Sequence, residues 1–254
     1  MPHPSHKPLI EVCVDSVESI ISALRGGAGR IELCSALSEG GLTPSIGLVH
    51  SALKLAEGLP IHVMIRPRMG DFLYTPEEQE LMLLDIQALL ELPIAGFVIG
   101  ALTEHGELDI DFLQRVASLV QGRKTLNCHR AFDVCRDREL ATRQLIKLGF
   151  QRILTSGGAS SAIEGANTLA SLIQHHGQDI IIMPGAGITP DNIKEVRMLT
   201  QAQEFHLSAK HAISSKMQYR HTGVSMGGGR VDEYTRYTTS EELLRYAVQA
   251  LSAE

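Results

Sequence analysis

Tryptophan is absent from this chain of 254 residues, and aromatic residues make up only 4% of it. Proteins that bind single-stranded nucleic acid stack bases on aromatic side chains and line their grooves with basic residues. Basic residues are outnumbered here, because 23 Lys and Arg stand against 29 Asp and Glu, which gives a formal net charge of -6. The composition therefore argues against nucleic acid or an anionic membrane as a partner.

Long hydrophobic runs are also absent. No stretch approaches the roughly 20 apolar residues that a membrane-spanning helix needs. The segment Met1 to Pro8 has no apolar signal core, so we expect it to be a loose N-terminal tail and expect no export. Four cysteines without close CxxC pairs fit a reducing compartment better than a disulfide framework. These absences together predict a cytoplasmic protein.

What the sequence does contain is one unit repeated eight times: a short apolar strand, a polar or glycine-rich loop and an amphipathic helix. The predicted strands are Leu9–Val14, Arg30–Cys34, Ile61–Arg66, Gly96–Gly100, Lys124–His129, Arg152–Ser156, Ile180–Pro184 and Glu204–Ser208. The predicted helices are Ser16–Arg25, Ser45–Glu57, Pro76–Leu92, Asp109–Val120, Arg138–Leu148, Ser161–His175, Pro190–Leu199 and Ser240–Ser252. No linker divides the chain, so we predict a single α/β domain over residues 1–254, a parallel (β/α)8 TIM barrel. An open doubly wound sheet is the alternative.

Polarity alternates along these strands. The first strand reads Ile-Glu-Val-Cys from Ile10 and the second reads Ile-Glu-Leu-Cys from Ile31. Because side chains alternate between the two faces of a strand, the aliphatic residues should face the helices and the polar ones the barrel interior. Barrel interiors are otherwise filled mostly by Val, Ile and Leu, so an interior rich in polar groups indicates a site. The candidate catalytic residues on this face are Glu11, Glu32, Arg66, Asn127, His129 and His206.

Two of these acids, Glu11 and Glu32, should lie close to each other and to Arg66. Neighbouring carboxyl groups repel when both are charged, so their pKa values can separate into one acid and one base. The planar guanidinium of Arg66 can bind a carboxylate or phosphate through two hydrogen bonds. For any single residue the alternative is an interior polar group with a purely structural hydrogen bond.

Two glycine-rich turns follow late strands. One contains Ser156, Gly157 and Gly158, and the other contains Gly185 and Gly187. Glycines let backbone amides approach an anion closely, so these turns and Arg66 are candidates for binding phosphate or carboxylate. The alternative is that the turns are tight strand-to-helix connections that need only small residues.

The segment of residues 209–239 is far longer than the usual connection of two to six residues. It follows the eighth predicted strand and precedes the last helix. A lid over the barrel mouth and an arm that grips a second subunit are the two functional roles that such a loop can have, and a disordered loop is the alternative.

Several short segments match a known family when taken together. They are Ile10–Cys13 (IEVC), Arg30–Cys34 (RIELC), Ile65–Arg68 (IRPR), Asn127–Asp133 (NCHRAFD), Ile153–Gly158 (ILTSGG) and Pro184–Ile188 (PGAGI). With these motifs the chain resembles the CutC family from Leu9 to its end. The resemblance implies a cytoplasmic TIM barrel associated with copper homeostasis and tolerance, and a homo-oligomer. It also implies a Cu(I) site at Cys13 and Cys34, which match the family's cysteines on the first two strands.

Two functions of different classes therefore stand side by side. The first is Cu(I) binding, because soft thiolate and thioether ligands select Cu(I), and Met64 on the third strand offers a third soft ligand. The second is a lyase or isomerase acting on a small phosphorylated or carboxylated substrate, with Glu11, Glu32 and His129 transferring protons. No organic cofactor is evident, so the expected ligand is a copper ion or a small anion.

Overall fold

Each apolar segment predicted to be a strand forms one, and the strands pair in parallel with their neighbours. A computed structural model describes residues 8–56, 58–221, 223–224 and 232–252, so most of the predicted N-terminal tail and the end of the second predicted helix lie outside the described residues. The strands are β1 (Leu9–Val14), β2 (Arg30–Leu33), β3 (Ile61–Met64), β4 (Gly96–Ile99), β5 (Thr125–Cys128), β6 (Arg152–Thr155), β7 (Ile181–Pro184) and β8 (Glu204–Leu207).

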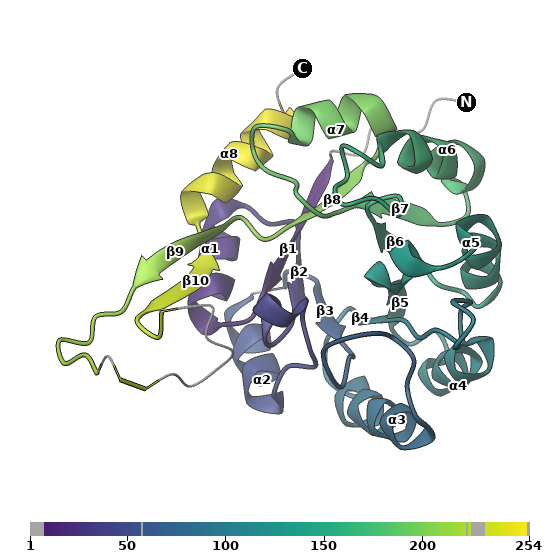
Figure 1. Cartoon of the computed structure of the whole chain (residues 1–254), viewed down its shortest axis with the longest axis horizontal. Helices are drawn as coiled ribbons and strands as arrows, with labels where there is room; N and C mark the ends of the chain where they lie inside the picture. Colours follow the sequence, from purple (N-terminus) through teal and green to yellow (C-terminus); the bar gives the residue numbers. More distant parts are fainter. Residues whose placement is uncertain (1–7, 57, 222, 225–231, 253–254) are drawn as a thin grey trace.

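These eight strands form one sheet in the order β7-β6-β5-β4-β3-β2-β1-β8. The two end strands, β7 and β8, also contact each other, so the sheet curves around into a barrel (Figure 1). The predicted (β/α)8 barrel is confirmed, and the open sheet is excluded.

Helices surround the strands, as the repeated unit predicts (Figure 1). At the start of α3, Thr75 accepts a hydrogen bond from the backbone of Glu78 while the Glu78 carboxylate accepts one from the backbone of Thr75. This reciprocal cap satisfies two amides that the first helical turn leaves free. The helices are α1 (Val17–Gly26), α2 (Ile46–Leu55), α3 (Pro76–Leu90), α4 (Ile110–Val120), α5 (Arg138–Lys147), α6 (Ala166–His176), α7 (Ile193–Thr200) and α8 (Glu241–Ser252).

Two of these helices begin several residues later than predicted. The α6 helix starts at Ala166, because the preceding Gly165 lies so close to the β6 turn that an added Cβ would stand 1.7 Å from the carbonyl oxygen of Ser156. The α7 helix starts at Ile193. Before it, the Asn192 side chain bonds the backbone of Thr189 and Gly187, and such local bonds compete with helical ones.

Side chains alternate between the helix-facing side and the interior of the barrel along each strand, as predicted. The main hydrophobic core lies between the strands and the helices and contains the aliphatic parity of the strands: Ile10, Val12, Ile31, Leu33, Ile61, Val63, Ile65, Phe97, Ile99, Phe205 and Leu207. A second, much smaller cluster is formed by Cys34, Met64 and Val98. Most residues of the opposite parity are buried too, so polar groups and thiols lie in the barrel interior together with this apolar cluster.

The long segment after β8 contains a hairpin of β9 (Lys210–Ser214) and β10 (Thr235–Thr239), paired antiparallel. Figure 1 shows this hairpin beside α1 and extending away from the eight strands, an arrangement that suits an arm rather than a lid. The glycines 227–229 lie outside the described residues.

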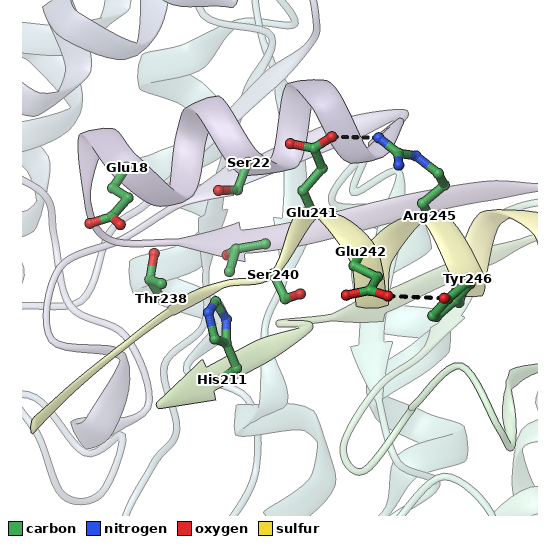
Figure 2. A pocket seen from close by; sticks show the side chains of 10 residues that line it. Glu18, Ser22, His211, Thr238, Ser240, Glu241, Glu242, Arg245 and Tyr246 are labelled. Atoms are coloured by element: carbon green, nitrogen blue, oxygen red, sulfur yellow. Dashed lines mark hydrogen bonds and ion pairs between the residues drawn. The ribbon is translucent and has the colours of Figure 1, made fainter. Parts of the chain in front are cut away.

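A polar hollow lies where this hairpin meets α1 and α8 (Figure 2). Four of its side chains form pairs, Arg245 with Glu241 and Tyr246 with Glu242, and Glu18 pairs with Arg236. Because the hollow lies outside the barrel and these groups have partners, we place the candidate site in the barrel interior.

Candidate functional site in the barrel interior

Two arginines and two glutamates form a charged floor at the N-terminal ends of the strands. Arg30 donates to Glu11 at 2.6 Å and to Glu204 at 2.5 Å, while Arg152 donates to Glu204 at 2.8 Å. Arg30 is only 3% exposed. Charges buried to this degree are tolerated only when they are paired and hydrogen-bonded. The floor therefore fixes the position of the Glu11 carboxylate.

Glu11 connects this floor with two histidines. Its carboxylate lies 2.8 Å from Nδ1 of His206 and 3.2 Å from Nδ1 of His62. Burial alone would raise the pKa of Glu11. The hydrogen bonds from the two histidines and the charge of Arg30 outweigh that effect and hold the pKa well below its usual range. Glu11 is therefore a fixed anion in the barrel.

The strand register decides which residues share the space above Glu11. Cys13 lies opposite Glu32 in the β1–β2 pair, and Cys34 follows two positions after Glu32. Two residues span roughly 6.6 Å along a strand, so Cys34 is displaced from Cys13 by about that distance along the strand direction. The Cys34 thiol lies 3.5 Å from Oε2 of Glu32. The two thiols thus flank the Glu32 carboxylate instead of facing each other directly.

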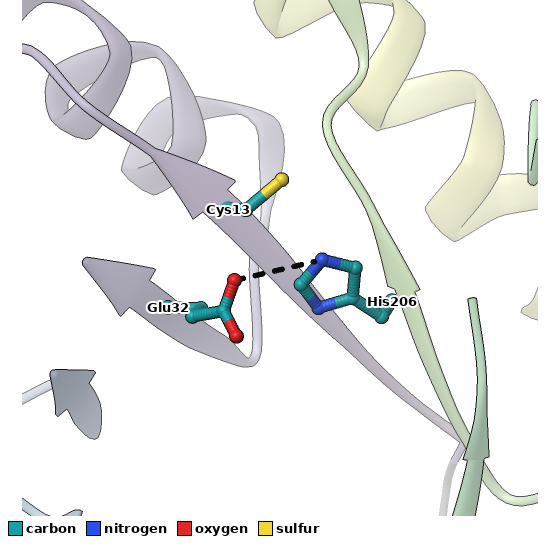
Figure 3. A group of neighbouring side chains, drawn as sticks. All are labelled: Cys13, Glu32 and His206. Carbon is teal, nitrogen blue, oxygen red and sulfur yellow. Dashed lines mark ion pairs between the residues drawn. The ribbon is translucent and has the colours of Figure 1, made fainter. Parts of the chain in front are cut away.

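The side chains of Cys13, Glu32 and His206 converge from three strands (Figure 3). One ligand atom of each lies within 4.8 Å of the others. Nε2 of His206 is 3.7 Å from Oε2 of Glu32. Oε1 of Glu32 is buried and has no hydrogen-bond partner in the described part of the chain. This trio combines sulfur, oxygen and nitrogen donors.

Burial and neighbouring charge set the protonation of this group. Burial and the nearby Glu11 raise the pKa of Glu32 to about 7, although the charge of His206 opposes this. Burial lowers the pKa of His206, but Glu32 and Cys13 more than compensate and leave it well above its ordinary value. Burial and Glu32 raise the pKa of the Cys34 thiol well above its usual range. The pKa values of Glu11 and Glu32 are thus shifted in opposite directions.

A second, soft set of sulfur donors, Cys13, Cys34 and Met64, shares Cys13 with this mixed trio. Cys34 packs with Met64 in the small interior cluster, and both side chains lie within 3.5 Å of where a Cβ on Gly41 would stand. Gly41 has a φ of 85°, which favours glycine and keeps this side of the thiol free of a side chain. Cys13, Cys34 and Met64 are all buried.

Arg66 is held by backbone carbonyl groups of two loops. Its Nη1 donates to the carbonyl oxygens of Glu39 and Gly41, and its Nη2 donates to that of Gly70. Its Nε is buried without a partner among the described residues. The predicted open fork for an anion is therefore largely occupied by backbone, and Nε with the second N–H of Nη2 is left to meet a ligand.

His129 belongs to the same side of the barrel as Arg66. Its ring packs on Phe72, 4.9 Å between centroids, and Arg66 lies over the same phenyl ring. Nδ1 accepts a hydrogen bond from the amide of Ala131, so the neutral ring carries its proton on Nε2, which is buried and has no partner in the described residues. Burial and the charge of Arg66 lower the pKa of His129 to about 3.

Asn127 makes hydrogen bonds to the two neighbouring strands, β4 and β6. Its amide nitrogen donates to the carbonyl oxygen of Phe97, and its oxygen accepts from Arg152 at 3.4 Å. The six residues predicted to share one pocket are all found in the interior, but their contacts group Glu11, Glu32 and His206 together, Arg66 with His129, and Asn127 with the floor.

The first glycine turn already holds an anion, which is part of the chain. The carboxylate of Asp133 accepts hydrogen bonds from the amides of Ser156 and Gly158, and from the hydroxyl of Thr155. The amide of Gly157 donates to that same hydroxyl. An external anion at this turn would have to compete with Asp133.

The second glycine turn is also partly committed. The amide of Gly185 donates to the carbonyl oxygen of Thr155. Ala186 and Gly187 have φ of 76° and 69°, in the left-handed region, and no hydrogen bond from the Gly187 amide is found among the described residues. The amide of Gly187 therefore remains a candidate anion donor.

Sequence reasoning missed Arg30, Arg152 and Glu204. All three have the same parity as the interior residues that follow them on their strands, so extending the alternation to the first residue of each strand finds them. Asp133 lies in a predicted motif, but nothing in its local sequence indicates a partner on β6. Tyr74, whose buried hydroxyl has no hydrogen-bond partner in the described residues, had no sequence signal either.

Comparison with known proteins identifies relatives of nearly full length. The model of the CutC family matches residues 8–211. A family protein CutC from Parabacteroides distasonis is 45% identical over 242 residues, covering 94% of this chain and 98% of that one. The copper homeostasis protein cutC homolog of Mus musculus is 44% identical over 238 residues, covering 93% of this chain and 87% of that one.

Solved structures agree with this result. The crystal structure of the CutC protein from Streptococcus agalactiae has a TM-score of 0.75 and 33% identity, covering 78% of this chain and 97% of that one. Thiamine phosphate pyrophosphorylase from Pyrococcus furiosus has a TM-score of 0.58 at 12% identity, covering 97% and 96% of the two chains, and this likeness concerns the fold alone. Among the described helices, none has the length and apolar character to cross a membrane.

Proposed function

The chain belongs to the CutC family, and on that premise we propose that it is a cytoplasmic copper(I)-binding protein of copper homeostasis. The observation that carries the proposal is the pair of buried, free thiols, Cys13 and Cys34, on neighbouring strands on either side of one carboxylate. A relative named as a copper homeostasis protein supports the physiological role.

The donor chemistry of the interior fits Cu(I). Thiolate and thioether sulfurs are soft ligands that favour this ion, and Met64 packs against Cys34. Both thiols would have to lose their protons on binding, and burial holds the pKa of Cys34 high, so the metal itself must drive deprotonation. A bound ion would lie beside Glu32, whose free oxygen is available as a neighbour.

Titration of the reduced protein against a competing Cu(I) chelator, without oxygen, tests the proposal. We expect the Cys13→Ser, Cys34→Ser double variant to lose affinity by about 100-fold or more, beyond the effect of losing a residue that only supports a ligand. A Cys128→Ser, Cys135→Ser double variant is the matched control, because these two thiols are equally buried but lie in the helix-facing core. If the two double variants bind Cu(I) with equal affinity, Cys13 and Cys34 are not the Cu(I) ligands.

Two further properties complete the proposal. The four cysteines are free and buried, which supports a reducing compartment such as the cytoplasm. The hairpin β9–β10 extends from the barrel and exposes Tyr237, which supports its use as an arm between copies in a homo-oligomer. Light scattering before and after deletion of the arm would test this part.

A second candidate function, a lyase or isomerase acting on a small anion, is favoured by one observation. Glu11 and Glu32 are neighbouring interior carboxyl groups whose pKa values are shifted in opposite directions. A carboxyl group with a pKa of about 7 can both give and take a proton near neutral pH. In this alternative, Nε of Arg66, Nε2 of His129 and the Tyr74 hydroxyl would bind the substrate's anionic group, since all three are buried without a partner among the described residues.

Thermal melts with sulfate or phosphate test this alternative. An anion at a hundred times its dissociation constant stabilises the fold by about 2.7 kcal/mol. Tyr74→Phe removes only the hydroxyl and should reduce this shift, whereas Tyr246→Phe, at an exposed hydroxyl, should keep it. Chloride at equal ionic strength controls for general salt effects. Equal shifts with sulfate and chloride in the wild-type protein would argue against a specific anion site.

A further inference from the structure

A mixed set of sulfur, oxygen and nitrogen donors lies in the barrel interior and shares Cys13 with the proposed Cu(I) site. Cys13, Glu32 and His206 come from β1, β2 and β8, and one ligand atom of each lies within 4.8 Å of the others (Figure 3). Two donors of a tetrahedral zinc ion at about 2.1 Å stand roughly 3.4 Å apart. Nε2 of His206 and Oε2 of Glu32 are 3.7 Å apart, so this pair of donors is already close to the spacing of two zinc ligands.

The hydrogen bonds from His206 to Glu11 and from Arg30 to Glu11 are of the kind that orients a metal-binding histidine. Nδ1 of His206 lies 2.8 Å from Glu11, and Glu11 is fixed in turn by Arg30 at 2.6 Å. A histidine that donates one ring N–H to a carboxylate presents the lone pair of its other nitrogen to a metal. Here that nitrogen, Nε2, is the one facing Glu32.

Glu32 provides an independent sign of a missing partner. It is 3% exposed, and its Oε1 has no hydrogen bond among the described residues. A buried carboxylate oxygen without a partner is costly, and a cation supplies one. The other oxygen, Oε2, accepts from the Cys34 thiol and faces Nε2 of His206, so a cation held by both oxygens of this carboxylate would also give Oε1 a partner.

We propose that Cys13, Glu32 and His206 form a three-ligand site for a divalent cation of the Zn²⁺ type, with Glu11 orienting His206. Sulfur, nitrogen and oxygen donors together suit Zn²⁺, and three protein ligands leave a fourth position for water or a substrate, as in catalytic zinc sites. This inference rests on the interior site of the proposed function. Because Cys13 belongs to both sets, Cu(I) and the divalent ion exclude each other.

Cobalt(II) is the probe, since its bond to a thiolate gives a charge-transfer band in the near ultraviolet. We expect the reduced wild-type protein to bind Co²⁺ with this band, the band to disappear in Cys13→Ser, and Co²⁺ affinity to fall by about 100-fold or more in His206→Gln. Cys34→Ser should keep the band, because the serine hydroxyl can still donate to Oε2 of Glu32, whereas its Cu(I) affinity should fall. Circular dichroism shows whether each variant is folded, and Cys128→Ser is the control thiol.

The Cys34→Ser variant separates the two proposals. Retained Co²⁺ binding with lost Cu(I) binding supports both ligand sets. Failure of the wild-type protein to bind Cu(I) would overturn the proposed function and leave the divalent site standing if the cobalt band is present. A band that persists in Cys13→Ser, or that is lost in Cys34→Ser, would overturn the mixed set.

Discussion

Replacing Arg30 with alanine is expected to lower the free energy of unfolding by about 3–5 kcal/mol at neutral pH. Arg30 is 3% exposed and bridges two carboxylates, Glu11 at 2.6 Å and Glu204 at 2.5 Å. Alanine would leave Glu11 buried with a charge that only two histidines oppose. Chemical denaturation monitored by circular dichroism measures the change.

Arg123→Ala is the matched control. Arg123 also pairs with a glutamate, Glu91, at 2.8 Å, but both side chains are largely in solvent. Exposed pairs contribute about 0–1 kcal/mol, so this variant should differ little from the wild-type protein. Arg30→Lys should lie between the two, because one ammonium group cannot reach both carboxylates with the geometry of a guanidinium. Equal losses in Arg30→Ala and Arg123→Ala would show that the floor does not support the fold.

The charged residues of the floor also show how far alternation along a strand predicts the barrel interior. The pattern of Glu11, Glu32 and His206 indicates a polar interior, and the structure confirms that the aliphatic parity faces the helices. The same pattern includes Arg30 and Glu204 at the first positions of their strands. The predicted strands already begin with these residues, but the interior set was assigned only from later positions of each strand, and for that reason these charges escaped the prediction.

The stagger of the strands could not be predicted from the sequence. Two similar motifs on β1 and β2 suggest that Cys13 and Cys34 face each other. In the structure, Cys13 pairs with Glu32 instead. The offset between neighbouring strands follows from closing the whole barrel, which depends on all eight strands together. The donors closest to Cys13 therefore include a histidine that is more than 190 positions away.

The glycine turn after β6 illustrates a different limit. Glycines in a turn indicate that backbone amides are accessible, but they do not indicate what binds to them. Here Asp133, 23 positions earlier than Ser156, supplies the carboxylate. An internal anion and an external one satisfy the same amides, so only the tertiary contacts distinguish them.

Acidification should destabilise the fold through His129, and this is the second large effect we expect. The pKa of this histidine is about 3 in the folded protein, because the ring is buried and lies near Arg66. In the unfolded chain a histidine has a pKa of about 6.5. Between these two values the unfolded state binds the additional proton, so stability is complete above about pH 6.5 and falls as the pH drops toward 3. At pH 5 this one group should reduce the free energy of unfolding by about 2 kcal/mol.

His129→Asn tests this effect, because asparagine can still accept the hydrogen bond from Ala131 but does not titrate. The variant should be less stable than the wild-type protein at pH 7.5, since it loses packing on Phe72. Its loss of stability between pH 7.5 and pH 5 should be smaller than that of the wild-type protein by about 2 kcal/mol. Urea denaturation at several pH values measures both differences, and His105→Asn, at an exposed histidine, should follow the wild-type pH dependence. If His129→Asn shows the same pH dependence as the wild-type protein, His129 takes up its proton in the folded state, and its Nε2 is not the buried, unpartnered donor described above.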